Sequence, residues 1–157
     1  MNQEVTVEII PFSPELKEYI KILNLEWLTK YFRVEEKDEL VLSNPQEEII
    51  EKGGMIFYAK LNNEIIGTVS LMKINAKTFE LSKMAVSDKA QGLGIGNKLL
   101  LYAFAKAKEN NVKKLILYSN RILSPAIHLY KKFGFVEVFL QEGLYERADI
   151  KMEKIIG

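Results

Sequence analysis

The sequence predicts an α/β fold of the α+β kind, with a single mixed, mostly antiparallel sheet flanked by helices. Its 157 residues suit one domain, so we expect residues 1–157 to share a single core. Apolar residues make up 48% and charged residues 27%, the balance of an ordinary globular protein. Segments of period two alternate with segments of helical period, and one strand, glycine loop, helix and strand follow each other as a crossover unit.

The first third of the chain predicts one strand and two helices. Apolar and polar residues alternate over residues 5–11, which indicates a half-buried strand. Ser13-Pro14 is typical of a helix start, and apolar residues then recur at helical spacing as far as Tyr31, which predicts an amphipathic helix of about five turns. A second helix is predicted to begin at the capping sequence Asn44-Pro45-Gln46-Glu47 and to end at Gly53-Gly54.

The rest of the chain predicts a hairpin, a third strand and two helix–strand units. The paired residues Asn62-Asn63 tolerate the positive φ of a tight turn, so they join two strands of the hairpin. The predicted elements are strands 55–61, 64–74 and 78–86, helix 94–110, strand 112–118, helix 124–133, and strands 135–140 and 149–156. The order is therefore β-α-α-β-β-β-α-β-α-β-β in one mixed sheet.

Charge and composition exclude several functional classes. The 22 basic and 21 acidic residues leave a formal charge of +1, which does not favour nucleic acid as a partner. The chain has no cysteine and only one histidine, His128, so we expect no thiolate nucleophile and no metal site. No apolar run approaches the roughly 20 residues that span a bilayer, and the first residues are unlike a signal peptide. We therefore expect a soluble cytoplasmic protein that does not bind membranes.

The sequence Gln91-Gly92-Leu93-Gly94-Ile95-Gly96 lies between a predicted strand and a predicted helix. The backbone N–H groups and the positive end of a helix can hold a diphosphate there, and glycine keeps side chains away from it. The alternative is a glycine turn that only packs the helix against the strand. A nucleotide-kinase loop is excluded because Gly96 is followed by Asn97 and Lys98. A dinucleotide fingerprint is disfavoured because its last glycine would fall on Asn97.

A second motif follows about thirty residues later, where a strand end is joined to a helix by Asn120 and the helix closes with Leu129, Tyr130, Gly134 and Phe135. Together with Gln91, Gly94 and Gly96 of the first motif, this pattern strongly resembles the GNAT superfamily of acyl-CoA N-acyltransferases. The predicted element order agrees with that family over nearly the whole chain. The resemblance implies a GNAT-like fold and an N-acetyltransferase that moves the acetyl group of acetyl-CoA to a primary amine. The alternative is a CoA-binding sensor or an inactive family member.

The resemblance also implies where the co-substrate acetyl-CoA binds. The diphosphate would lie on the amides of residues 91–96, and the pantetheine would run beside the strand 81–86. Asn120 would hold the other side of the pantetheine, and the amide of Met84 would polarise the thioester oxygen. The full set of implied coenzyme-binding residues is Met84, Val86, Gln91, Gly92, Leu93, Gly94, Ile95, Gly96, Asn97 and Asn120.

Two residues are candidates for proton transfer. The phenol of Tyr130, with an ordinary pKa of about 10, can protonate the departing thiolate; the alternative is a core tyrosine that packs on Phe133. Glu80 occupies the place where the histone-modifying branch of the family carries its general base. Strand alternation would put Glu80 and Met84 on one face. The alternatives are an ordinary strand glutamate, or a mechanism in which solvent takes the proton.

The acceptor-binding residues implied by the resemblance come from the first helix, from the segment after it and from the approach to the last strand. Trp27 and Tyr31 would border the acceptor, although a stripe at helical spacing is also typical of a core. Glu35 and Asp38 would attract a cationic amine. Tyr145 would contact the acceptor, unless its neighbourhood is an ordinary charged hairpin. The acceptor is expected to be a small-molecule or peptide amine, and the sequence leaves the oligomeric state open, a homodimer included.

Overall fold

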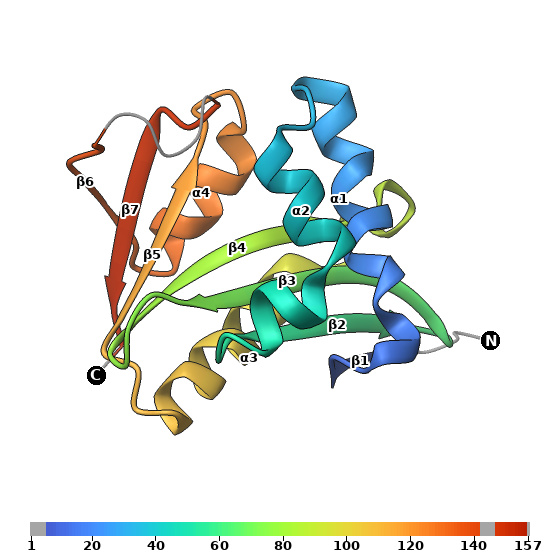
Figure 1. The fold of residues 1–157 in the computed structure, drawn as a ribbon. Helices are drawn as coiled ribbons and strands as arrows, with labels where there is room; N and C mark the ends of the chain where they lie inside the picture. Colours follow the sequence, from blue (N-terminus) through green and yellow to red (C-terminus); the bar gives the residue numbers. More distant parts are fainter. Residues whose placement is uncertain (1–5, 142–146, 157) are drawn as a thin grey trace.

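The computed structural model describes residues 6–141 and 147–156, which form one seven-stranded sheet in the order β1-β2-β3-β4-β5-β7-β6 (Figure 1). Within these residues β4 and β5 are the one parallel pair, so the predicted mixed, mostly antiparallel sheet is confirmed. No helix of the described part is long and apolar enough to cross a membrane. The elements are β1 (Val7–Pro11), η1 (Pro14–Leu16), α1 (Glu18–Tyr31), α2 (Glu36–Ser43), η2 (Gln46–Ile50), β2 (Met55–Leu61), β3 (Glu64–Lys73), β4 (Thr78–Val86), η3 (Asp88–Ala90), α3 (Ile95–Glu109), β5 (Lys114–Ser119), α4 (Ser124–Lys132), β6 (Val136–Val138) and β7 (Ile150–Ile155).

The helix predicted from Asn44 to Gly53-Gly54 is present only as the short π-helix η2, and helix α2, which precedes it, was not predicted. Helix α2 begins after Glu35, where the backbone N–H of Glu35 donates to the side chain of Asp38 at 2.9 Å in a capping box. Asn44, expected as an N-cap, instead ends α2, and only one π-helical turn, η2, follows it. The capping box is formed by two carboxylates, Glu35 and Asp38. Because glutamate is not among the short polar residues that usually occupy an N-cap, the sequence around Glu35 does not indicate a helix start.

Helices cover both faces of the sheet and create two cores. Helices α1 and α2 lie on one face, over a cluster that includes Leu28, Leu42 and Tyr58. Helix α3 packs on the other face, where Leu99 belongs to the larger cluster. Gly67 of β3 permits this packing, because a Cβ there would lie 3.0 Å from Ile95 and 3.1 Å from Leu99. The sheet therefore separates an α1–α2 side from an α3 side.

A β-bulge in β4 changes which face its side chains occupy. Ser70 pairs with Ser82, but Thr68 pairs with Ala85, so β4 carries one extra residue in this stretch. Lys83 lies in the bulge with a φ of 51°, in the left-handed region. As a result Met84 packs against the core on the α3 side and Ala85 against the core on the α1–α2 side. The predicted alternation, which put Glu80 and Met84 on one face, is wrong because the bulge reverses it.

Strands β4 and β5 separate where their pairing stops. Their parallel register runs from Thr78 with Lys114 to Glu80 with Ile116, yet β4 continues to Val86 and β5 to Ser119. Figure 1 shows the two strands diverging beyond that point. Beyond Glu80 and Ile116 the facing edges of β4 and β5 are therefore not paired with each other, and a gap forms in the middle of the sheet. The candidate site lies in this gap.

Candidate active site

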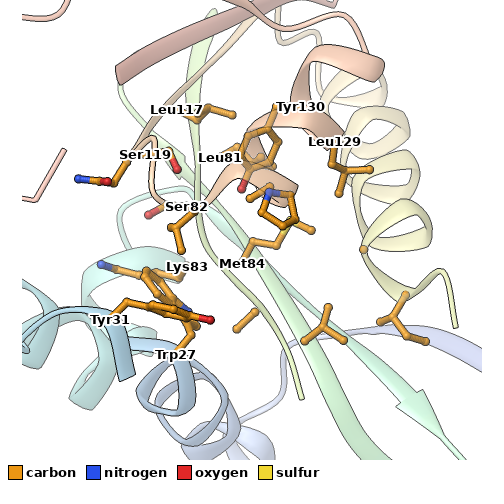
Figure 2. A pocket seen from close by; sticks show the side chains of 18 of the residues that line it. Trp27, Tyr31, Leu81, Ser82, Lys83, Met84, Leu117, Ser119, Leu129 and Tyr130 are labelled. Atoms are coloured by element: carbon orange, nitrogen blue, oxygen red, sulfur yellow. The ribbon is translucent and has the colours of Figure 1, made fainter. Parts of the chain in front are cut away.

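A cavity of about 600 Å³ occupies the opening between β4 and β5. Its walls come from the end of α1, from β4, from the glycine loop with the start of α3, and from the end of β5 with α4. Figure 2 shows Trp27 and Tyr31 at one end and Tyr130 and Leu129 at the other, with Lys83 and Met84 of β4 between them. The size is that of a pocket for a small-molecule ligand.

The glycine loop, residues 91–96, here called the glycine cradle, lies at the cavity wall where α3 begins. Gly92 and Gly94 have φ angles of 82° and 73°, and a Cβ at either position would meet no atom within 4 Å. Gly94 is the N-cap of α3, and among the described residues no side chain caps this helix. The first backbone N–H groups of α3 therefore face the cavity without a side-chain acceptor, which suits a diphosphate. Leu93 is the member of the loop that does not line the cavity; its side chain is exposed.

Three amide side chains lie at the glycine loop and at the end of β5. Gln91 donates from Nε2 to the carbonyl of Val86 at 3.1 Å, which ties the loop to the end of β4. Asn120 donates from Nδ2 to the carbonyl of Arg147 at 2.6 Å and accepts the backbone N–H of Ile122. Asn120 therefore joins the end of β5 to the segment before β7, and its predicted contact with pantetheine stays a prediction. The Oδ1 atom of Asn97 is buried without a hydrogen-bond partner in the described residues, so this cavity-lining amide offers an acceptor.

Tyr130 lies on α4 and lines the cavity. Its ring packs edge-on against Phe135, with the ring centroids 5.8 Å apart, so Tyr130 both lines the cavity and packs on the core. Burial raises the pKa of the Tyr130 phenol to about 12. A phenol with this pKa is protonated throughout the neutral range, which is the state that a proton donor requires.

Glu80 also lines the cavity and is only 8% exposed. It pairs across the sheet with Met72, whose side chain packs on the α1–α2 core, so Glu80 lies on that side of the sheet. The pKa of the Tyr118 phenol is raised, mainly by burial and to a smaller extent by the negative charge of the nearby Glu80 carboxylate. Glu80 is thus a nearly buried carboxylate that lines the cavity on the α1–α2 side of the sheet.

The acceptor residues expected from the first helix divide into two groups. Trp27 and Tyr31 line the cavity, together with Phe32, which packs edge-on against the Trp27 ring at 6.0 Å. Glu35 and Asp38 are absent from the cavity lining, and both carboxylates are bonded to Arg147, which does line it. Tyr145 lies outside the described residues, so its predicted contact stays a prediction.

Four charged residues, two of them buried and two partly buried, form a cluster beside the cavity, here called the Asp38 network: Glu35, Asp38, Lys83 and Arg147. Arg147 contacts both oxygens of Asp38, at 2.6 and 2.7 Å, and Glu35 at 2.6 Å. Lys83 contacts Asp38 at 2.8 Å. Burial alone would raise the pKa of Asp38, but the hydrogen bonds from Arg147 and Lys83 and the Lys83 charge outweigh it and lower the pKa to about 2.

The sequence reasoning missed three residues that matter here: Asn24, Lys83 and Arg147. Asn24 is fully buried on α1 and donates to the carbonyl of Lys83 at 3.0 Å. A signal for it exists, because Asn24 is a polar residue inside the apolar helical stripe that includes Leu23 and Leu28. Lys83 and Arg147 carry no such signal, since their partner Asp38 is 45 and 109 residues away.

A mixed sheet split beside a glycine-lined helix start defines the class of the protein: this is the acyl-CoA N-acyltransferase fold. The chain belongs to the acetyltransferase (GNAT) family, whose model matches residues 20–135.

Two relatives from Bacillus subtilis (strain 168) are similar in sequence. The uncharacterized N-acetyltransferase YvbK is 29% identical over 101 residues, which cover 62% of this chain and 65% of YvbK. Streptothricin acetyltransferase A is 32% identical over 107 residues, which cover 68% of this chain and 59% of that protein. The chain therefore matches less than two thirds of the length of each of these relatives.

Solved structures agree on the fold over nearly the full chain. An acetyltransferase of the GNAT family from Staphylococcus aureus MU50 has a TM-score of 0.88 at 22% identity and covers 97% of this chain and all of its own. The PaiA N-acetyltransferase from Thermoplasma acidophilum, solved in complex with coenzyme A, has a TM-score of 0.75 at 23% identity, with 96% of this chain and 99% of that chain covered. At these identities the likeness establishes the fold alone.

Proposed function

We propose that the protein transfers the acetyl group of acetyl-CoA to a primary amine, which attacks the thioester directly. The observation that carries the proposal is the cavity between the separated strands β4 and β5, with a glycine cradle at one wall and the Tyr130 phenol facing it. Family membership and the coenzyme A bound to the Thermoplasma acidophilum neighbour support the same co-substrate.

The residues of the cavity suit the parts of this co-substrate. The cradle around Gly92 and Gly94 and the start of α3 would hold the diphosphate. The open edge of β4 from residue 81 to 86 would hold the pantetheine, and the Met84 amide would donate to the thioester oxygen as negative charge develops there. The cavity-lining positions of Met84 and Val86 fit this role.

Two proton transfers complete the proposed reaction. The amine loses a proton as its nitrogen bonds to the carbonyl carbon, and Glu80 is the proposed acceptor of that proton. When the carbon–sulfur bond breaks, the Tyr130 hydroxyl gives its proton to the departing sulfur, so that free coenzyme A and an N-acetylated amine result. The raised pKa of Tyr130 keeps the phenol protonated at neutral pH, which is the form that a proton donor needs at the start of the reaction.

The acceptor would enter at the end of the cavity bordered by Trp27 and Tyr31, where the aromatic faces suit the alkyl part or the positive charge of an amine. The decisive experiment incubates the purified protein with acetyl-CoA and an unbiased panel of amines, including diamines, aminoglycosides, streptothricin and peptides with free amino termini. Thiol release reports turnover, and mass spectrometry identifies the acetylated product.

The outcomes separate the proposal from its main alternative. Amine-dependent thiol release with an acetylated product supports the transferase. Calorimetric binding of acetyl-CoA without release for any amine in the panel supports the alternative, a CoA-binding sensor or an inactive family member. Absence of acetyl-CoA binding contradicts both.

A further inference from the structure

Asn24 connects α1 to the bulge of β4. Its Nδ2 donates to the carbonyl of Ile20 at 2.8 Å and to the carbonyl of Lys83 at 3.0 Å, and its Oδ1 accepts the indole N–H of Trp27 at 3.2 Å. The side chain is completely buried. Both N–H groups and the oxygen of the amide are thus engaged, so its orientation is fixed.

Lys83 is held at two points. Its carbonyl accepts from Asn24, and its ammonium group contacts Asp38 at 2.8 Å, with 5% of its side chain exposed. Its φ of 51° is a conformation that residues other than glycine rarely adopt. Such a conformation persists where the surroundings hold it, and here α1 and α2 both do.

The direction of the Lys83 carbonyl fixes that of the next amide. In a trans peptide the C=O of one residue and the N–H of the next point in opposite directions. Because Asn24 draws the Lys83 carbonyl toward α1, the N–H of Met84 is directed away from α1, toward the α3 side of the sheet. That is the side on which Met84 packs, and Met84 lines the cavity.

We propose that Asn24 is a positioning residue that sets the Lys83–Met84 peptide, so that the Met84 N–H is already aimed at the thioester oxygen before the reaction. This inference rests on the proposed function, since that function already takes the Met84 amide as the donor that polarises the thioester. Stabilisation of this kind depends on donors that need no reorientation during the reaction. Removal of Asn24 would leave the buried Lys83 carbonyl without its partner and would release the peptide to rotate.

The test is difference infrared spectroscopy of bound acetyl-CoA carrying carbon-13 in the thioester carbonyl, recorded without an acceptor. In the parent protein a hydrogen bond to the thioester oxygen lowers the carbonyl stretching frequency. In Asn24→Leu the frequency should return toward that of the free thioester, and kcat for an identified amine should fall about 10- to 100-fold. The calorimetric Kd for acetyl-CoA should stay within about threefold, because the diphosphate cradle is unchanged.

Asn44→Leu is the matched control. Asn44 also donates from Nδ2 to the carbonyl four residues earlier, that of Leu40 at 2.9 Å, but it is exposed at the end of α2. It should keep the parent frequency and kcat. If Asn24→Leu does not fold, Trp27→Phe removes the indole N–H that orients Asn24, and a smaller frequency change in the same direction is expected.

The results distinguish this inference from the proposed function. The inference is overturned, and the proposed transferase is left intact, if a folded Asn24→Leu protein has the frequency and turnover of the parent. If Asn24→Leu does not fold, the same result in Trp27→Phe overturns it. A parent protein that shows no lowered frequency overturns it too. A parent that binds and polarises acetyl-CoA, loses the effect on substitution of Asn24, but acetylates no amine supports the inference while the proposed transfer fails.

Discussion

The two ends of the cavity are built in different ways. The end proposed for acetyl-CoA, here called the coenzyme end, is made mainly of backbone: a run of six consecutive residues, 91–96, supplies the glycines and the start of α3. The end proposed for the amine, here called the acceptor end, is made of side chains from distant segments, and beside it Arg147 contacts Asp38 across 109 residues of sequence. One end presents backbone N–H groups around open space, and the other is supported from beside the cavity by the ion pairs of the Asp38 network.

This difference implies a division of tasks. A backbone cradle binds any ligand with a diphosphate, so it suits a co-substrate that a whole family shares. The partly buried ion pairs of the Asp38 network hold α2, the bulge of β4 and the segment before β7 in one arrangement. Removal of one member leaves a buried charge without its partner, so the folded protein should lose stability sharply. We therefore expect changes at the coenzyme end to affect binding and chemistry, and changes in the network to affect folding first.

The largest effect should come from Tyr130→Phe, which removes one hydroxyl from the coenzyme end. We expect kcat to fall by about two to four powers of ten, because the departing thiolate loses its proton donor. Acetyl-CoA affinity, measured by calorimetry, should change little. Tyr102→Phe is the control, since Tyr102 packs on Phe57 outside the cavity lining. Turnover of Tyr130→Phe within a few-fold of the parent would assign Tyr130 to packing alone.

Gly94→Glu should weaken acetyl-CoA binding at least about 100-fold, equivalent to roughly 3 kcal/mol. A carboxylate would enter the open space beside the start of α3 and repel the diphosphate. Gly53→Glu is the matched control, because Gly53 also has a positive φ, 95°, and gains the same charge away from the cavity lining. Equal affinity in a folded Gly94→Glu protein would show that the cradle is only a packing turn.

The same contrast explains which features of the fold and of the site could be predicted from the sequence. The sheet, helices α1, α3 and α4, and the glycine loop were predictable because their signals are periodic or contiguous, as in residues 91–96. The bulge at Lys83 was not, because a single inserted residue leaves the apolar pattern of β4 readable as an ordinary strand. The Asp38 network was not either, since acidic residues after a helix are usually solvated, and only the fold brings Arg147 to them.

Asp38 should make stability depend on pH in the acid range. Its pKa is about 2 in the folded protein and 3.8 ordinarily, so the unfolded state takes up the proton more readily. The stabilisation is therefore complete above about pH 4 and is lost as pH falls toward 2, by up to about 2 kcal/mol. Urea unfolding of the parent and of Asp38→Asn across this range measures the difference.

Asp38→Asn should be less stable than the parent at pH 7, because Lys83 and Arg147 lose their shared carboxylate. Its free energy of unfolding should also fall less than that of the parent between about pH 4 and pH 2, because the contribution of Asp38 is absent. Asp149→Asn is the control at an exposed position, and it should keep the parent's acid loss because the Asp38 network is intact. Identical pH dependence in Asp38→Asn and the parent would contradict a folding role for the network.

The smallest effect should come from Glu80→Gln, at the boundary between the two ends of the cavity. An alkyl amine with a pKa near 10.4 is only about 0.04% neutral at pH 7, and only the neutral form can attack the thioester. A nearby carboxylate that accepts the proton is therefore most useful near neutral pH. Glu80 is nearly buried, lines the cavity and lies on the α1–α2 side, toward the acceptor end.

We expect Glu80→Gln to lower kcat/KM about tenfold at pH 7 and to recover much of that loss as pH rises toward 10, where more of the amine is already neutral. Pre-steady-state or steady-state thiol release with one identified amine, measured at intervals across this range, gives both profiles. A glutamate that only fills its place in β4 would instead produce a uniform loss or none. Two parallel profiles would therefore remove Glu80 from the reaction, assign the proton to solvent, and leave the acceptor end with a role in binding alone.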